Sequence, residues 1–168
     1  MSQRSIRVRP ALRLHLGLKS LRRAGGIGFM IDLPPERGFE ITFRQHHGFS
    51  VSSGPLHKRI ENAAKAYAET VHQSESAVPN CSIQVQGAPL LHCGLGMGTA
   101  VSMSVARALY RYEMNVGDLD PAVCAEMLGR GKRSAIGTRG SFQGGFIHDD
   151  FKDEDGLAAC ISQHGMPI

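Results

Sequence analysis

The sequence predicts a domain of mixed strands and helices, and two kinds of periodicity predict it. Apolar and polar residues alternate with the period of a strand over 6–18 and 39–43. Residues 56–73 and 100–114 instead place their apolar residues at helical spacing. With 168 residues, 42% of them hydrophobic, the chain is long enough for one sizeable domain or two small ones.

Composition and charge favour a protein that binds a small anionic ligand over one that binds nucleic acid. The 20 glycines cluster in loops, which favours a binding or catalytic protein over a helical bundle. The formal net charge of +4 suits an anionic ligand but is too small to indicate nucleic acid. Three Tyr, seven Phe and no Trp offer little surface for base stacking. We therefore expect a small anionic partner and no nucleic acid.

Cysteine usage and hydropathy predict a cytoplasmic protein with no membrane partner. The four cysteines form no Cys-x-x-Cys pair and are typical of buried or incidental thiols in a reducing compartment. No apolar run approaches the roughly 18 residues of a membrane helix. Arginines before the first acidic residue, Asp32, resemble an organelle transit peptide. However, Arg7, Arg9 and Arg13 alternate with apolar residues, which indicates a strand.

The first predicted strand carries a candidate catalytic pair. Residues 6–18 form a strand that Pro10 interrupts, because proline cannot donate to a sheet ladder. Arg13 and His15 are two residues apart, so their side chains lie on one face. That face is either solvated or directed at an anion. A glycine turn then leads into an apolar strand up to Ile31.

The middle of the chain alternates turns, a helix and a strand. A turn at 34–38 precedes the strand 39–43, and His46 with His47 predicts a polar turn rather than a metal site. Pro55 marks the start of an amphipathic helix over 56–73, and a strand over 82–86 follows it. The buried stripe of that helix comprises Ile60, Ala63, Ala64, Tyr67 and Val71. Its solvent face comprises Lys58, Arg59, Glu61, Lys65 and Glu69.

A glycine-rich loop opens the helix 100–114 and is the strongest candidate for a ligand site. The loop consists of Gly94, Leu95, Gly96, Met97, Gly98 and Thr99. Glycines allow close backbone approach, and unpaired N–H groups at a helix start attract anions, so the loop could cradle a phosphate. A tight turn with a glycine cap explains the spacing equally well. The stretch has neither the lysine and hydroxyl ending of a P-loop nor the Gly-x-Gly-x-x-Gly spacing.

A second glycine-rich stretch, 129–140, follows a short helix that ends at Leu128 and is capped around Asp120. It combines backbone N–H groups, hydroxyls and cations, which together bind phosphate or pyrophosphate. The candidate residues are Arg130, Gly131, Lys132, Arg133 and Ser134. The alternative is a flexible basic surface loop. A strand is expected over 141–147, and no regular element is expected after Lys152.

Five stretches occur in an order that resembles a known family. They are Pro10–Leu18, Gly25–Gly28, Gly94–Thr99, Gly129–Gly131 together with Ser134–Gly137, and Gly144–Ile147. The sequence resembles the beta-ribofuranosylaminobenzene 5'-phosphate synthases of the GHMP-kinase-like superfamily. The resemblance covers about residues 4–150 and corresponds to the N-terminal domain of that family. We therefore expect a domain over 1–150, an irregular tail over 151–168 and no counterpart of the family's C-terminal domain.

The resemblance implies an α+β sandwich of the ribosomal S5 domain 2-like type, with a mixed sheet and helices on one face. It also implies a phosphoribosyltransferase that joins phosphoribosyl pyrophosphate to 4-hydroxybenzoate or 4-aminobenzoate. Carbon dioxide and pyrophosphate are released, in tetrahydromethanopterin biosynthesis, and Mg²⁺ is the implied ion. Arg13 and His15 become the catalytic candidates. A homo-oligomer, or a separate chain that supplies the C-terminal half, is the expected partner.

Two departures from the family pattern keep other functions open. Met97 replaces a small hydroxyl residue and Ala100 replaces a glutamine. One alternative is an ATP-dependent small-molecule kinase of the GHMP type, in which hydroxyl residues after the glycine loop help to bind magnesium. Met97 and Gly98 occupy those places here. The other alternative is a non-catalytic binding subunit that retains half of the fold.

Overall fold

The computed structural model describes residues 4–18, 25–34, 36, 38–87, 93–115, 117–131, 136–152 and 158–160. Within these residues the strands form two four-stranded sheets. The first sheet has the order β1 (Ser5–Val8), β4 (Phe39–Gln45), β6 (Cys81–Gly87) and β5 (Ser50–Val51). The second has the order β2 (Leu12–Leu18), β3 (Gly26–Ile31), β7 (Phe146–Lys152) and β8 (Ala158–Cys160).

Pro10 separates the two sheets at the start of the chain. The predicted strand over 6–18 is interrupted at this buried proline, as expected, and its two halves enter different sheets. β1 pairs antiparallel with β4, and β2 pairs antiparallel with β3. Because proline donates no backbone hydrogen bond, neither ladder could continue through this position. The break therefore directs Arg13 and His15 into the second sheet.

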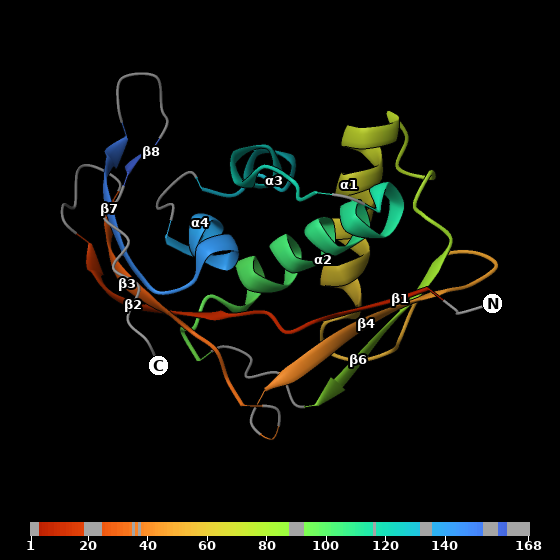
Figure 1. Ribbon diagram of the computed structural model, residues 1–168, viewed down its shortest axis with the longest axis horizontal. Coiled ribbons are helices and arrows are strands. Elements are labelled where there is room, and N and C mark those ends of the chain that lie inside the picture. The colour runs from red at the N-terminus through yellow and green to blue at the C-terminus, as the bar shows by residue number, and fades with distance from the viewer. Residues whose placement is uncertain are drawn as a thin grey trace.

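The helices cover one face of the first sheet, as the predicted sandwich requires. α1 (His57–His72) and α2 (Met97–Met114) pack against each other above β1, β4 and β6, and α3 (Pro121–Met127) lies over α2 (Figure 1). The core between these layers is formed by fully buried side chains of α1, α2, β4 and β6. They include Ile60, Ala64, Tyr67, Val101, Val105, Leu109, Ile41, Phe43 and Ile83. No helix in the described ranges is both long and apolar enough to cross a membrane.

The fourth helix corrects the prediction for 129–147. Residues 136–143 form α4 (Ile136–Gln143), which lies inside the curve of the second sheet (Figure 1), so the loop ends earlier and the strand begins later than expected. Glycine disfavours helix on its own. Here Gly140 allows the helix to contact Met30 and Ile147 directly, and a Cβ at Gly140 would overlap both side chains. Burial of Ile136 against the same two residues stabilises this contact.

The end of the chain also differs from the prediction. We expected 151–168 to contain no regular element, but β7 continues to Lys152 and β8 pairs with it antiparallel. The apolar residues Leu157–Ile161 follow the acidic stretch 153–155, and such a run suits a strand at a sheet edge. The prediction of an entirely irregular tail was therefore wrong.

Candidate phosphate-binding site

The glycine loop turns sharply into α2. Gly94 and Gly96 have φ of 74° and 65°, in the left-handed region that favours glycine. Gly96 is the N-cap of the helix, and its carbonyl accepts hydrogen bonds from the N–H groups of Thr99 and Ala100 at 3.0 and 3.1 Å. The predicted glycine loop that opens a helix is confirmed, although the helix begins at Met97 and not at Ala100.

The first turn of α2 leaves backbone donors free. Gly96 has no side chain to cap the helix, and the first turn contains no acidic residue. Among the described residues, none accepts a hydrogen bond from the N–H groups of Met97 or Gly98. The Met97 side chain is buried, so the helix end is anchored while its backbone donors remain free. A helix start with free N–H groups carries a partial positive charge and attracts anions.

Arg13 connects the second sheet to this loop. Its backbone N–H donates to the carbonyl of Leu95 at 2.8 Å. Its side chain occupies space that two glycines leave open: a Cβ at Gly96 would lie 3.2 Å from Nε of Arg13, and one at Gly137 would lie 3.5 Å from Nη1. The buried Nε has no hydrogen-bond partner within the described part of the chain. Burial lowers the pKa of Arg13, but a guanidinium remains charged at neutral pH.

A cavity of about 390 Å³ opens beside the loop. Its lining comprises Pro55, Leu56, Arg59, Cys93, Gly94, Leu95, Gly96, Met97, Gly98, Thr99 and Arg130. The structure therefore brings Arg130 to the glycine loop, although about thirty residues separate them in the sequence. None of these lining residues is acidic, and no described residue forms an ion pair with Arg59 or Arg130. The described lining of the cavity is thus positively charged and contains no counter-ion.

Sequence reasoning missed Arg59, which was placed on the solvent face of its helix. In the structure its guanidinium lies over the first turn of α2, where a Cβ at Gly98 would be 2.5 Å from Nη1 of Arg59. One signal could have identified it. Lys58 and Arg59 lie in the first turn of α1, where the helix dipole disfavours cations and no acidic residue compensates. Cations at such a position suggest a role outside their own helix.

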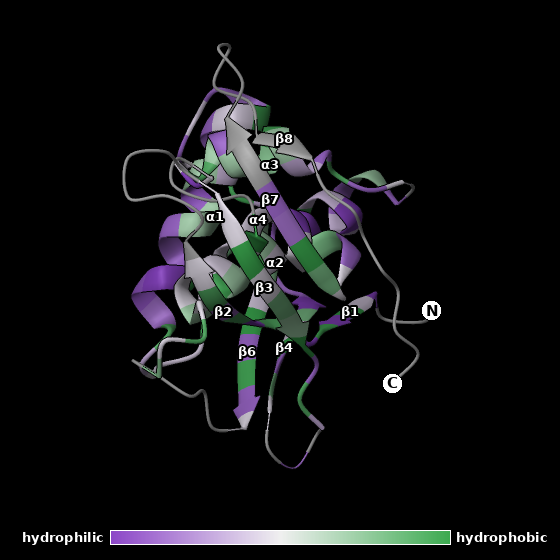
Figure 2. Cartoon of the chain, turned by 90° about the vertical axis from the view of Figure 1, so that its left-hand side faces the viewer, coloured by the Kyte–Doolittle hydropathy of each residue, from purple (hydrophilic) through white to green (hydrophobic). Residues whose placement is uncertain are grey.

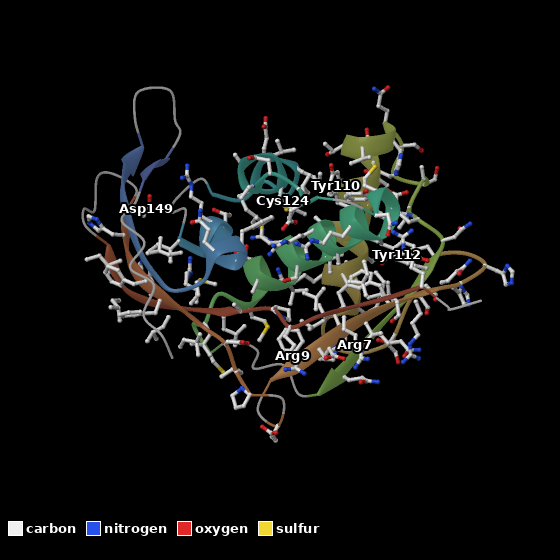
Figure 3. The ribbon with its side chains drawn as sticks, viewed as in Figure 1. Arg7, Arg9, Tyr110, Tyr112, Cys124 and Asp149 are labelled. Atoms are coloured by element: carbon white, nitrogen blue, oxygen red, sulfur yellow. The ribbon has the colours of Figure 1, made fainter. Side chains whose placement is uncertain are left out.

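His15 lies on the same face of β2 as Arg13 but does not line the cavity. Its Nε2 atom is buried, has no hydrogen-bond partner among the described residues and would lie 2.8 Å from a Cβ at Gly26. Burial, assisted by the charge of Arg13, lowers the pKa of His15, and the charge of Asp149 opposes this effect in part. Asp149 is buried on β7 of the same sheet (Figure 3). The imidazole is therefore neutral at pH 7.

The other residues that the sequence suggested for the site do not line the cavity or are not described. Gly131 lies near Ala125 and Thr138 and does not line the cavity. Lys132, Arg133 and Ser134 lie outside the described residues. Arg7 and Arg9 are exposed on the N-terminal strand and the turn after it, away from the glycine loop (Figure 3). Of the arginines that alternate along this segment, Arg13 is the one that contacts the loop.

Metal-binding groups are sparse near the cavity. Nδ1 of His46 lies 3.2 Å from the carbonyl oxygen of Gly48, so the predicted polar turn is confirmed. In the described ranges, no group of three or more His, Cys, Asp or Glu residues is placed to hold a metal ion. Mg²⁺ prefers carboxylate oxygens together with the phosphate of a substrate. Because the described residues that line the cavity include no carboxylate, they do not form a Mg²⁺ site by themselves.

Comparison with known proteins supports the resemblance seen in the sequence. No family model matches the chain. The chain is 31% identical over 151 residues to beta-ribofuranosylphenol 5'-phosphate synthase of Archaeoglobus fulgidus. The match covers 86% of this chain and 44% of that protein, so the chain spans less than half the length of this relative.

Solved structures identify the fold. Mevalonate kinase of Methanococcus jannaschii matches 96% of this chain with a TM-score of 0.61 and 15% identity, and 56% of that kinase is covered. Phosphomevalonate kinase of Streptococcus pneumoniae matches 88% of the chain with a TM-score of 0.58 and 14% identity, over 49% of its length. The chain therefore has the α+β fold of the GHMP kinases, and in sequence it resembles beta-ribofuranosylphenol 5'-phosphate synthase.

Proposed function

We propose that this protein binds phosphoribosyl pyrophosphate in the cavity beside the glycine loop. We further propose that it acts in the transfer of the phosphoribosyl group to 4-hydroxybenzoate or 4-aminobenzoate, in tetrahydromethanopterin biosynthesis. The observation that carries the proposal is the cavity itself: free N–H groups of α2, Arg59 and Arg130 converge there without an acidic residue. The similarity to beta-ribofuranosylphenol 5'-phosphate synthase supports this choice of reaction.

The reaction exchanges one bond at ribose for another. The bond between C1 of ribose and the pyrophosphate oxygen breaks, and C1 forms a bond to the ring carbon that bears the carboxylate. The bond between that ring carbon and the carboxylate then breaks, which releases carbon dioxide and restores the aromatic ring. Pyrophosphate gains negative charge as it leaves. Donors that are already oriented, such as the Met97 and Gly98 N–H groups and the Arg59 guanidinium, stabilise that charge.

Arg13 and His15 have distinct roles in this proposal. Arg13 lies against the loop and adds positive charge behind Gly96. Burial lowers the pKa of His15 and keeps the imidazole neutral. Its Nε2 is buried and His15 does not line the cavity, so we assign it a positioning role beside Arg13 on the same face of β2.

Mg²⁺ remains part of the proposal through the family resemblance alone. The residues that line the cavity offer backbone groups and cations but no carboxylate, and they do not fit a metal held by the protein. We therefore derive no step through the metal, and each role above belongs to residues of this chain.

A GHMP-type kinase is the second candidate function, because the fold matches mevalonate kinase. One observation weighs against it. Met97 and Gly98 begin α2 and present no hydroxyl, and the Met97 side chain is buried in the core. At these two positions the loop therefore lacks the hydroxyl groups that would help to hold the metal of a bound ATP.

The free thiols favour a reducing compartment for this activity. Cys81 and Cys124 are buried and form no disulfide. Free thiols persist in the cytoplasm, where disulfides are rare. We therefore place the proposed reaction there.

Pyrophosphate binding tests the site. Arg130→Ala and Arg59→Ala should each raise the Kd of pyrophosphate about tenfold or more, because charge-assisted hydrogen bonds contribute roughly 1.5–3 kcal/mol. Folding should be little affected, since both side chains are exposed. Titration calorimetry measures the Kd, and Lys65→Ala, an equal loss of charge outside the cavity, is the control. Unchanged affinity in both arginine variants would contradict the site.

Catalysis is tested with carboxyl-labelled 4-hydroxybenzoate, phosphoribosyl pyrophosphate and Mg²⁺. The proposal predicts equal release of labelled carbon dioxide and pyrophosphate, strongly reduced in Arg13→Ala and His15→Ala. Tight pyrophosphate binding without release of carbon dioxide would identify a binding subunit instead. Conversion of ATP to ADP with phosphorylation of a small-molecule acceptor would identify a kinase.

A further inference from the structure

A second cavity adjoins the cavity beside the glycine loop. Its volume is about 490 Å³, and it lies in a groove between α1 and the end of α3. Its lining comprises Pro55, Lys58, Arg59, Asn62, Ala63, Ala66, Ser102, Met127, Leu128 and Arg130. Pro55, Arg59 and Arg130 line both cavities, so the two hollows share a wall. We call this second hollow the α1–α3 groove.

The α1–α3 groove extends away from the loop along one side of α1. Lys58, Asn62 and Ala66 are four residues apart in sequence and therefore lie on one face of the helix. At a rise of 1.5 Å per residue, this stripe is about 12 Å long. The small side chains of Ala63 and Ala66 leave room on this face, and Met127 and Leu128 form the opposite wall. Figure 1 shows α3 beside α1, with α2 below α3 and crossing α1.

The charges in the α1–α3 groove have one sign. Lys58, Arg59 and Arg130 line it, and none of its lining residues is acidic. Glu61, the acidic residue nearest to Lys58 on α1, pairs with Lys65 at 3.0 Å and does not line the groove; its pKa is lowered mainly by Lys65 and to a smaller extent by the charge of Lys58. Within the described residues, Lys58 forms no ion pair. Cations that share a cavity without a counter-ion repel one another and favour an anionic occupant.

We infer that the α1–α3 groove is a second phosphate subsite, filled by a ligand whose first phosphate group occupies the glycine-loop cavity. The ligand class is a sugar phosphate with two separated phosphoryl groups. Arg59 and Arg130 lie between the two groups, Lys58 and Asn62 bind the distal one, and Met127 and Leu128 contact the carbon skeleton. This inference rests on the proposed function, in which pyrophosphate fills the loop cavity and the 5-phosphate of ribose enters the groove.

The test compares two probes on variants of α1. One probe, phosphoribosyl pyrophosphate, carries a diphosphate and a separate 5-phosphate. The other probe, inorganic pyrophosphate, carries the diphosphate alone. Lys58→Ala removes one groove cation, and Asn62→Asp adds a negative charge without a change of shape. Both side chains are exposed, so the variants should fold. Lys65→Ala is the matched control, because it removes the same charge from the same helix outside the groove.

Each variant should raise the Kd of phosphoribosyl pyrophosphate about tenfold and leave the Kd of pyrophosphate within about twofold. Lys65→Ala should change neither. Equal effects of Lys58→Ala on both probes, or no effect on either, would overturn the second subsite while the loop site stands. Failure of the unmodified protein to bind pyrophosphate would overturn the proposed function and the subsite together.

Discussion

At the scale of single residues, an exposed cysteine directly precedes the glycine loop, and its reactivity can be used to detect a ligand in the cavity. Cys93 is exposed and lines the loop cavity. Cys81 and Cys124 are buried, and burial raises the pKa of each thiol to about 12. Cys124 on α3 lies against Met103 of α2, with 3.7 Å between the two sulfur atoms (Figure 3). Because the thiolate is the reactive form, Cys93 should react well before these two.

Thiol labelling therefore provides the first prediction. In a Cys160→Ser background, an aromatic disulfide reagent should modify Cys93 first, and saturating pyrophosphate should slow that reaction several-fold. Phosphate at the loop would cover the thiol, whereas Cys81 and Cys124 should remain unmodified until the protein unfolds. The rate of thiol release in the absorbance spectrum measures the effect. A Cys93 rate that saturating pyrophosphate leaves unchanged would place the ligand elsewhere.

A second prediction concerns the conformation of the loop. Gly96→Ala should destabilise the fold by about 1–2 kcal/mol, because a left-handed backbone costs that much in an alanine. The new Cβ would also lie 3.2 Å from the Arg13 side chain, so pyrophosphate binding should weaken. Gly48→Ala is the control, since a Cβ there meets open space. Thermal unfolding and calorimetry measure the two effects, and a Gly96→Ala protein as stable as the control would contradict the strained turn.

At the scale of elements, Asp118 joins α2 to the segment that leads into α3. Arg107 donates through Nε to both carboxylate oxygens at 2.7 Å, and Arg111 donates at 2.8 Å. Burial would raise the pKa of Asp118, but the hydrogen bonds and charges of Arg107 and Arg111 outweigh it and lower the pKa. A carboxyl group with a lowered folded pKa stabilises the protein above its unfolded pKa, and that contribution is lost as the pH falls through the folded value.

Asp118→Asn should therefore lower the free energy of unfolding by roughly 1 kcal/mol at pH 7. This magnitude is expected for a partly exposed ion pair that includes several hydrogen bonds. The difference from the unmodified protein should shrink as the pH falls from 3.8, the usual pKa, through the lower pKa of the folded protein, below which Asp118 is protonated in both states. Urea unfolding across this range measures it. Glu75→Gln, on an exposed residue, is the control. A difference that does not depend on pH would contradict an ionic link.

Most elements follow from local sequence, and the exceptions have physical causes. Local sequence predicts the helical periodicity of α1 and α2 and the break at Pro10. It also predicts the cap of α3, where Asp120 accepts hydrogen bonds from the N–H groups of Ala122 and Val123. α4 could not be predicted, because glycines disfavour a helix when only the local sequence is considered. The reason for a glycine at position 140 is the close contact of α4 with β3 and β7. The part of this contact with Met30 of β3 joins residues more than one hundred positions apart.

The candidate site was predictable in part for the same reason. The glycine spacing identified the loop, and the run of cations identified Arg130. Arg59 was missed because helical periodicity places it on the polar side of α1 and does not show that α2 begins beneath that side. Side chains that reach a site from a neighbouring helix require the packing of the two helices, which the sequence pattern does not contain.

At the scale of the whole molecule, the second sheet has an open apolar face. Leu14 and Leu16 of β2 are 41% and 56% exposed. Leu14 lies opposite Phe29 on the neighbouring strand β3, and Phe29 lies opposite Phe146 on β7. The ring centroids of Phe29 and Phe146 are 5.0 Å apart. Figure 2 shows apolar stretches of β3 and β7 side by side on this face. Exposed apolar surface of this kind usually forms an interface.

We therefore expect self-association or binding of a separate chain through this face. Light scattering should give a mass above that of one chain, and Leu16→Lys should reduce it to the monomer mass. Met114→Lys is the control, because Met114 is an exposed apolar residue at the end of α2. A monomer at high concentration that also captures no partner chain would contradict this expectation.

The central claim is that the glycine-loop cavity serves phosphoribosyl pyrophosphate and not ATP. A ligand that binds only the folded protein stabilises it by about 2.7 kcal/mol at one hundred times its Kd. The most direct measurement is therefore the thermal unfolding midpoint with each compound at equal concentration, together with calorimetric Kd values. The claim predicts a larger rise in Tm and a lower Kd for phosphoribosyl pyrophosphate. An equal or larger rise with ATP would contradict it and favour the kinase.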